Sequence, residues 1–114
     1  MSRVAIQHLI ERVSESITIA SGATSGTFTF RKPGKLRGIR YSTNNNTNNV
    51  TTVITITDDE DAVIYTSAAL NENTNGYLTP TELCLYDSTH TITCTSADPG
   101  ASGNIVGLSL LIER

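Results

Sequence analysis

Short runs in which threonine alternates with a large apolar residue recur along this chain. They occupy residues 27–30, 53–57 and 91–95. Successive side chains of a β-strand point to opposite faces of the sheet, so each run presents threonines on one face and apolar residues on the other. This alternation is typical of antiparallel sheets with one buried face and one face in water. The pattern therefore predicts half-buried β-strands.

Eight or nine such strands follow one another at short spacing, with turn-forming residues between them. Pro33-Gly34 and Pro99-Gly100 are two of these turn signals, since proline presets φ and glycine accepts positive φ. The pattern predicts an all-β fold, an antiparallel β-sandwich or barrel of about eight or nine short strands. With 114 residues the chain is expected to form one domain, residues 16–114, preceded by an N-terminal arm or edge strand, residues 1–15.

Some strand pairings and loops can also be predicted. The strands on either side of Pro33-Gly34 are expected to form a hairpin, and so are those on either side of residues 87–89. The acidic residues 58–61 are expected to turn the chain between two strands. The asparagine-rich residues 43–49 are predicted to form a surface loop, and residues 71–80 a long polar connection.

Composition and charge narrow the range of binding partners that the protein could have. The net charge is −3, whereas a nucleic-acid-binding domain would normally carry a basic face. No apolar stretch is long enough to span a membrane, and the N-terminal residues lack the apolar core of a secretory signal. We therefore expect neither nucleic acid nor membrane as a partner, and synthesis in a cytoplasm. Aromatic residues make up only 5% of the chain, so its thin core would gain from oligomerisation.

The two cysteines, Cys84 and Cys94, leave a disulfide and two small buried thiols as alternatives. If a hairpin turned at residues 87–89, the two cysteines would be diagonal neighbours, roughly 7–8 Å apart. That separation is poor for a disulfide, so the thiols are favoured.

Catalytic motifs are missing from the sequence. There is no Gly-x-Ser-x-Gly elbow, and His90, beside an expected turn, is interpreted as a solvated histidine. The acidic residues 58–61 could be a calcium site, but they lack the spacing of an EF-hand loop, so a solvated turn is favoured. We expect a protein that is not an enzyme and that carries no cofactor or metal.

Basic residues are concentrated around the Pro33-Gly34 turn. One interpretation is a docking patch for an acidic surface, and the other is an edge hairpin protected by charge against strand-to-strand aggregation. Both interpretations remain open. The candidate partner-binding residues of this patch are Arg31, Lys32, Lys35, Arg37 and Arg40.

Four stretches of the chain resemble small virion structural proteins of tailed bacteriophages. They are residues 35–41, with glycine followed by Ile-Arg-Tyr, the strand at residues 53–58, the short apolar strand at residues 62–66, and the glycine-containing strand at residues 102–108. The resemblance extends over residues 26–112. It is greatest to capsid decoration (cement) proteins, and the longer N-terminal segment of this chain departs from that pattern.

The resemblance implies a β-rich protein without cofactor, found in the virion, that forms a homotrimer and binds the major capsid protein on the outside of the phage head. Such a protein would stabilise the mature shell by binding it in preference to its precursor. The apolar side chains of Val4, Ile6 and Leu9 would then pack between subunits or along the shell by strand addition.

Three alternatives remain. The protein could be a head–tail or tail component, a receptor-binding spike, or a carbohydrate-binding β-sandwich module. Sugar sites usually have aromatic side chains on which a sugar ring stacks. Because the chain has no tryptophan, these would have to be Tyr41, Tyr65, Tyr77 and Tyr86.

Overall fold

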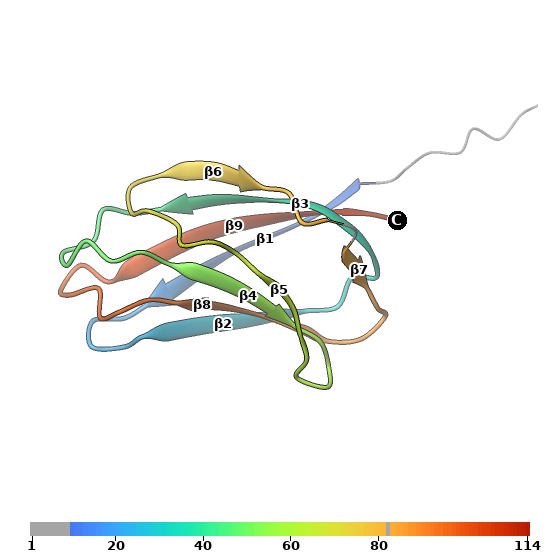
Figure 1. Ribbon diagram of the computed structural model, residues 1–114, viewed down its shortest axis with the longest axis horizontal. Helices are drawn as coiled ribbons and strands as arrows, with labels where there is room; N and C mark the ends of the chain where they lie inside the picture. Colours follow the sequence, from blue (N-terminus) through green and yellow to red (C-terminus); the bar gives the residue numbers. More distant parts are fainter. Residues whose placement is uncertain (1–9, 82) are drawn as a thin grey trace, which may run out of the picture.

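The protein is a β-sandwich of two antiparallel sheets, which confirms the predicted fold class (Figure 1). The computed structural model describes residues 10–81 and 83–114. Nine strands lie within these residues, and none of these residues is helical, so the described part has no helix that could cross a membrane. The strands are β1 (Ile10–Ile19), β2 (Ser25–Phe30), β3 (Gly34–Thr43), β4 (Val53–Thr57), β5 (Val63–Thr66), β6 (Asn75–Leu78), β7 (Leu83–Leu85), β8 (His90–Thr95) and β9 (Asn104–Glu113).

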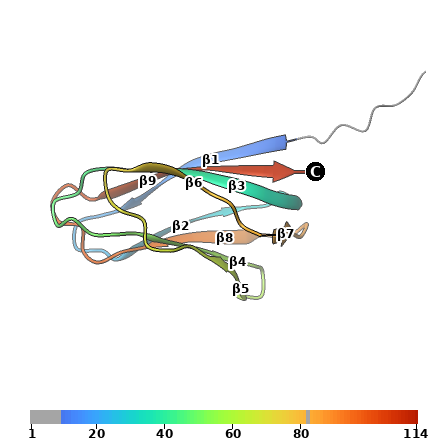
Figure 2. The same ribbon diagram turned by 45° about the horizontal axis from the view of Figure 1, so that its top comes forward.

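The order of the strands is that of a jelly roll. One sheet has the order β1-β9-β3-β6, with the short β7 also paired to β3, and the other has the order β2-β8-β4-β5. The chain crosses from sheet to sheet at almost every connection, which gives the two layers seen in Figure 2. Jelly rolls are double-sheet folds of this kind. Among the described strands, β4 and β5 are the one consecutive pair that forms a hairpin.

The other two predicted hairpins are wrong. The residues around Pro33-Gly34 lead from β2 in one sheet to β3 in the other, and residues 86–89 lead from β7 to β8 in the same way. Turn-forming residues show where a strand ends, but they serve equally well in a hairpin and in a connection between two packed sheets. The alternation of apolar residues is the same in both cases, so it could not distinguish them.

Two segments also differ from the sequence-based description. Asn75 and Gly76, predicted within a polar connection, begin β6. The N-terminal strand β1 is one continuous edge strand from Ile10 to Ile19, paired with β9 along its whole length. It therefore runs across the predicted boundary between residues 15 and 16. Residues 1–9, with Val4, Ile6 and Leu9, lie outside the described residues.

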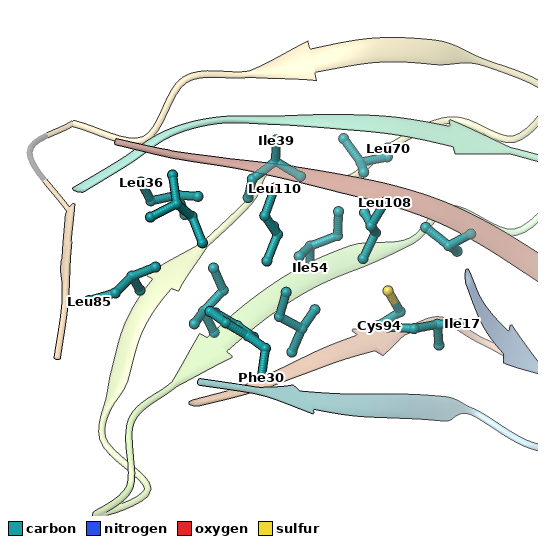
Figure 3. Packing of buried hydrophobic residues seen from close by; sticks show 14 of the residues in the cluster. Ile17, Phe30, Leu36, Ile39, Ile54, Leu70, Leu85, Cys94, Leu108 and Leu110 are labelled. Carbon is teal, nitrogen blue, oxygen red and sulfur yellow. The ribbon is translucent and has the colours of Figure 1, made fainter. Parts of the chain in front are cut away.

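The core lies between the two sheets, where alternate apolar residues of both sheets meet (Figure 3). Leu108 and Leu110 of β9 face Ile54 of β4 and Cys94 of β8 across the interior, and Phe30 packs into the core from β2. Because the side-chain period of a strand is two, this inward set fixes which residues point outward. The outward positions of each sheet are therefore available for contacts with other molecules.

Threonines cover the outer face of the β2-β8-β4-β5 sheet in rows. One row joins Thr27, Thr93, Thr55 and Thr66, which are register partners on four neighbouring strands. The next row joins residues 29, 91 and 57, again all threonine. None of the outward-facing residues of these four strands carries a charge.

Candidate binding groove

An open groove lies on the outer face of the β1-β9-β3-β6 sheet, opposite the threonine rows. Its volume is about 1020 Å³, just above the ~300–1,000 Å³ that small-molecule sites occupy. Four of the five strands of this sheet, all but the short β7, contribute to it. The lining residues are Ser14, Glu15, Ser16, Arg40, Tyr41, Ser42, Asn75, Gly76, Tyr77, Gly107, Leu108, Ser109 and Leu111.

The floor of the groove consists of small residues because β9 alternates large and small side chains. Leu108 and Leu110 point into the core, so Gly107 and Ser109 between them point outward. Gly107 lies in register between Ser16 and Ser42, and a Cβ atom there would lie 2.7 Å from Ser42 Oγ. The absence of a side chain at residue 107 therefore leaves room above the sheet.

Hydroxyl groups are spread across this floor. Ser14 and Ser109 are register partners whose Oγ atoms are 3.0 Å apart and share a hydrogen bond. Ser16 and Ser42 flank Gly107 in the next row, and Asn75 follows Ser42 on β6. Serine hydroxyls both donate and accept hydrogen bonds, and the asparagine amide does so through two atoms. The floor can thus bind a ligand with many hydroxyl groups.

Tyr77 provides an aromatic surface on the β6 side of the groove. It pairs with Arg40 in register, and its side chain extends over Gly38, where a Cβ atom would lie within 2.7 Å of three atoms of the phenol. One side of the ring thus rests on the glycine, while 52% of the residue remains exposed. Tyr41 is also among the lining residues, but it is the register partner of the inward-facing Leu108 and packs against the core, so its ring is not part of this outer surface. Of the four tyrosines considered from the sequence, Tyr65 and Tyr86 do not line it.

Two of the lining residues are charged, Arg40 on β3 and Glu15 on the edge strand β1. Arg40 pairs with the outward-facing Ser109, whereas Glu15 pairs with the inward-facing Leu108, so of the two side chains only that of Arg40 projects on the groove side. Arg40 lies between Ser109 of β9 and Tyr77 of β6 in the register. Within the described residues Arg40 has no carboxylate partner. A guanidinium group with free N–H donors therefore stands beside the aromatic ring.

The other basic residues of the predicted docking patch are placed differently. Arg31 Nε is 2.9 Å from Asp87 Oδ1, Lys32 Nζ is 3.4 Å from Glu11 Oε2, and Arg37 Nη2 is 2.6 Å from Glu113 Oε1. Lys35 pairs in register with Glu113 and Cys84. Three of the five predicted residues are thus engaged in ion pairs within the chain, and only Arg40 lines the groove. Whether the patch docks a partner stays a prediction.

The interpretation of His90 as a solvated histidine is wrong. Its side chain is fully buried, with the ring stacked on Phe30 at a centroid distance of 5.6 Å and Nδ1 3.0 Å from the carbonyl oxygen of Ser88. The reason is the register of β8, in which His90 is an inward position opposite Phe30. His90 is not a groove residue.

The acidic residues 58–61 form the β4–β5 turn, as predicted. Asp58 Oδ1 accepts hydrogen bonds from the backbone N–H groups of Glu60 and Ala62, both at 2.9 Å. This carboxylate therefore shapes the turn. Among the described residues, no group of three or more His, Cys, Asp or Glu side chains is placed to hold a metal ion.

The cysteines are both free thiols. Cys94 is buried, as expected, and burial raises the pKa of its thiol to about 12. Cys84 is exposed, so the prediction that both thiols are buried is wrong for it. The two residues lie in different sheets, Cys84 on β7 and Cys94 on β8, because the hairpin expected between them does not form.

The groove itself was not predicted from the sequence. The sequence pattern assigns Arg40 to the docking patch and offers Tyr77 as an aromatic surface, but no sequence feature indicates that the two are neighbours. They meet because β6 pairs with β3, a contact between residues 37 positions apart. The one available signal was the alternation of small with large residues at 107–110, which indicates a shallow outer face.

The comparisons with known proteins found neither a family model nor a curated protein that matches this chain. Solved structures that are similar include Arthrobacter globiformis T6 isomalto-dextranase complexed with panose (17% identity, 81% of this chain and 17% of that chain, TM-score 0.49). A second is the carbohydrate-binding module TmCBM61 in complex with β-1,4-galactotriose (9% identity, 92% of this chain and 82% of that chain, TM-score 0.49). A third is infectious bursal disease virus Gx strain (10% identity, 94% of this chain and 33% of that chain, TM-score 0.48). This chain thus spans less than a fifth of the isomalto-dextranase. Likenesses at these values carry no information on function.

Proposed function

We propose that the protein is a carbohydrate-binding domain whose ligand lies in the groove on the β1-β9-β3-β6 sheet. The observation that carries this proposal is the exposed Tyr77, whose ring lies over Gly38 beside a floor of serine hydroxyls. A sugar ring has an apolar face of C–H groups and a rim of hydroxyl groups. The aromatic ring can stack on the apolar face of the sugar, and the serine and asparagine side chains can form hydrogen bonds with its hydroxyl groups.

The shape of the groove agrees with a sugar chain. The groove is open and shallow, and it runs over four strands. A shallow site suits a ligand that lies along the sheet and makes many polar contacts, each worth about 1 kcal/mol. Such a ligand needs no enclosed pocket.

Binding rather than turnover is proposed because the groove offers few catalytic groups. Glycoside hydrolysis normally needs two carboxyl groups on either side of the scissile bond. Among the groove residues listed above, Glu15 is the one carboxylate. We therefore propose a domain without enzymatic activity.

The test is binding to a panel of immobilised oligosaccharides by the wild-type protein and by Tyr77→Ala. We expect the variant to lose most of its binding, at least tenfold in affinity, because the stacking surface is removed. The control is Tyr86→Ala, which removes a similarly exposed tyrosine (59%) outside the groove and should bind like the wild type.

Equal binding by Tyr77→Ala and the wild type would place the sugar site elsewhere. If the panel shows no binding at concentrations up to the millimolar range, the protein is not a carbohydrate-binding domain. Circular dichroism of all three proteins would verify that each is folded.

A second candidate, a structural virion protein, is favoured by the threonine rows. Interface cores are depleted of charged residues, and the outward side chains of β2, β8 and β4 are uncharged hydroxyl or methyl groups. We propose that this face would bind the major capsid protein, with the protein acting as a homotrimeric decoration protein. In that arrangement the groove would point away from the shell.

This candidate is tested by cosedimentation of the protein with capsids. Thr55→Lys and Thr93→Lys, which place charges at the centre of the rows, should abolish binding, whereas Tyr77→Ala should not affect it. Elution as a monomer at micromolar concentration, or retained capsid binding by both lysine variants, would contradict the proposal.

A further inference from the structure

We infer that the sugar bound in the groove carries a carboxylate, as a uronic acid or a sialic acid does, and that Arg40 binds it. This inference rests on the proposed function and names the class of sugar for the same groove. It starts from the distribution of positive charge over the molecule, which distinguishes Arg40 from the other basic residues.

Most basic side chains in the described part of the chain already have an acidic partner. Arg31, Lys32, Arg37 and Arg114 each lie within 3.4 Å of a carboxylate oxygen. Arg12, Lys35 and Arg40 have no ion pair within the described residues, and of these three only Arg40 lines the groove. The groove therefore contains an uncompensated guanidinium group.

The surroundings of Arg40 suit a planar anion. A guanidinium group presents its N–H donors as a fork that matches both oxygens of a carboxylate. Arg40 lies in register between Ser109 and Tyr77, whose hydroxyl groups can donate further hydrogen bonds. A carboxylate attached to a sugar ring that stacks on Tyr77 would lie within the same stretch of the groove.

Glu15, the other charged residue at the groove, does not oppose this charge from inside it. It is the register partner of Leu108, which points into the core, so its side chain projects from the other face of β1 than Ser14 and Ser16 do. Among the lining residues, Arg40 is therefore the one whose charge lies on the groove side of the sheet.

The experiment compares acidic oligosaccharides with neutral counterparts of the same backbone. Oligogalacturonates are paired with their methyl esters, and sialyllactose with lactose, and affinities are measured by calorimetry. We expect at least one acidic member to bind about tenfold more tightly than its neutral partner. Raising the salt concentration should weaken binding of the acid and leave binding of the neutral sugar nearly unchanged.

Variants assign the effect to the guanidinium group. Arg40→Gln should lose the preference for the acid, measured as the ratio of the affinities for the acidic and the neutral sugar, and Arg40→Lys should restore part of that preference. Arg12→Gln removes the same charge from an exposed outward position of β1 that does not line the groove. This control should keep the preference.

The outcomes separate this inference from the proposed function. Equal affinity for acidic and neutral sugars, or an unchanged preference in Arg40→Gln, would overturn the role of Arg40 and leave carbohydrate binding standing. A loss of preference in Arg12→Gln equal to that in Arg40→Gln would also overturn it, since general surface charge would be the cause. If neither acidic nor neutral sugars bind, the proposed function fails and this inference fails with it.

Discussion

Single residues determine how open the groove is. Gly107 and Gly38 are both outward positions of strands, and neither adopts positive φ, so glycine is not needed there for the backbone. At each position a neighbouring side chain occupies the space that a Cβ would take: Ser42 at Gly107 and Tyr77 at Gly38. The two glycines thus determine the shape of the outer surface and are not required by the backbone conformation.

Gly107→Ala should therefore stabilise the protein while weakening binding of a sugar. Glycine inside a strand costs roughly 0.5–1 kcal/mol relative to alanine, and Ser42 is exposed, so its hydroxyl can turn away from the new methyl group. We expect the free energy of unfolding to rise by about 0.5 kcal/mol, as measured by denaturant titration. A fall in stability would show that Ser42 cannot move.

Asp98 links two loops at one end of the sandwich and makes stability depend on pH. Its Oδ1 atom accepts hydrogen bonds from the N–H groups of Gly100 and Gly22, both at 2.9 Å, and these bonds lower the pKa of the carboxyl group. Because the folded pKa lies below the unfolded value of about 3.9, the contribution of Asp98 is complete well above pH 4. It is lost as the pH falls through the folded value.

Asp98→Ala should accordingly destabilise the protein at pH 7 and have a smaller effect near pH 2. Thermal unfolding at both pH values, for the variant and the wild type, gives the two differences. A difference of the same size at both pH values would show that the ionised carboxylate is not what matters. Glu60→Ala, an acidic residue on an exposed turn, is a suitable control.

The two thiols should differ in reactivity. Cys84 is exposed, whereas burial raises the pKa of Cys94 to about 12, so almost no thiolate forms there at neutral pH. A thiol reagent should modify Cys84 alone in the native protein and both cysteines in denaturant. Rapid modification of Cys94 in native Cys84→Ser would mean that the core around β8 opens easily.

At the scale of the elements, β9 shows how one strand serves the core and the groove together. It is the only described strand that pairs with both β1 and β3, and its buried residues alternate strictly with half-buried or exposed ones. Leu110 is fully buried, and the adjacent Leu111 lines the groove. The two leucines are chemically identical, so their different roles come from the strand period alone.

Leu110→Ala should cost about 2–5 kcal/mol of unfolding free energy, as expected for a large-to-small change in a packed core. Leu111→Ala should cost about 1 kcal/mol or less, because its position is open to the groove. Chemical denaturation of both variants measures the difference. Similar losses in the two would contradict the assignment of inner and outer faces.

The strands could be predicted from the sequence far better than their partners. Alternation identified β2, β4, β8 and β9, and the acidic turn identified the one hairpin, β4–β5. Pairing between β9 and β1 joins residues about a hundred positions apart, and no local pattern encodes it. The burial of His90 is not predictable for the same reason, since it depends on the pairing of β8 with β2.

At the scale of the whole molecule, the sandwich has two unlike faces. One outer face carries the groove with its aromatic ring and guanidinium group, and the other carries uncharged threonines. The core between them fixes both faces at once, because each inward residue determines its outward neighbours. The two proposed functions therefore use different faces, ligand binding in the groove and protein binding at the threonine rows, and one does not block the other.

The threonine rows have a consequence for folding. If β8 shifted by two residues between β2 and β4, threonine would still meet threonine on the outside, and large side chains would still face the interior. The repeat therefore offers weak protection against a misaligned sheet. Correct alignment must come from unique features at the strand ends, such as the stacking of His90 on Phe30. Replacing His90 with isoleucine would extend the repeat and should produce a slow refolding phase from out-of-register chains.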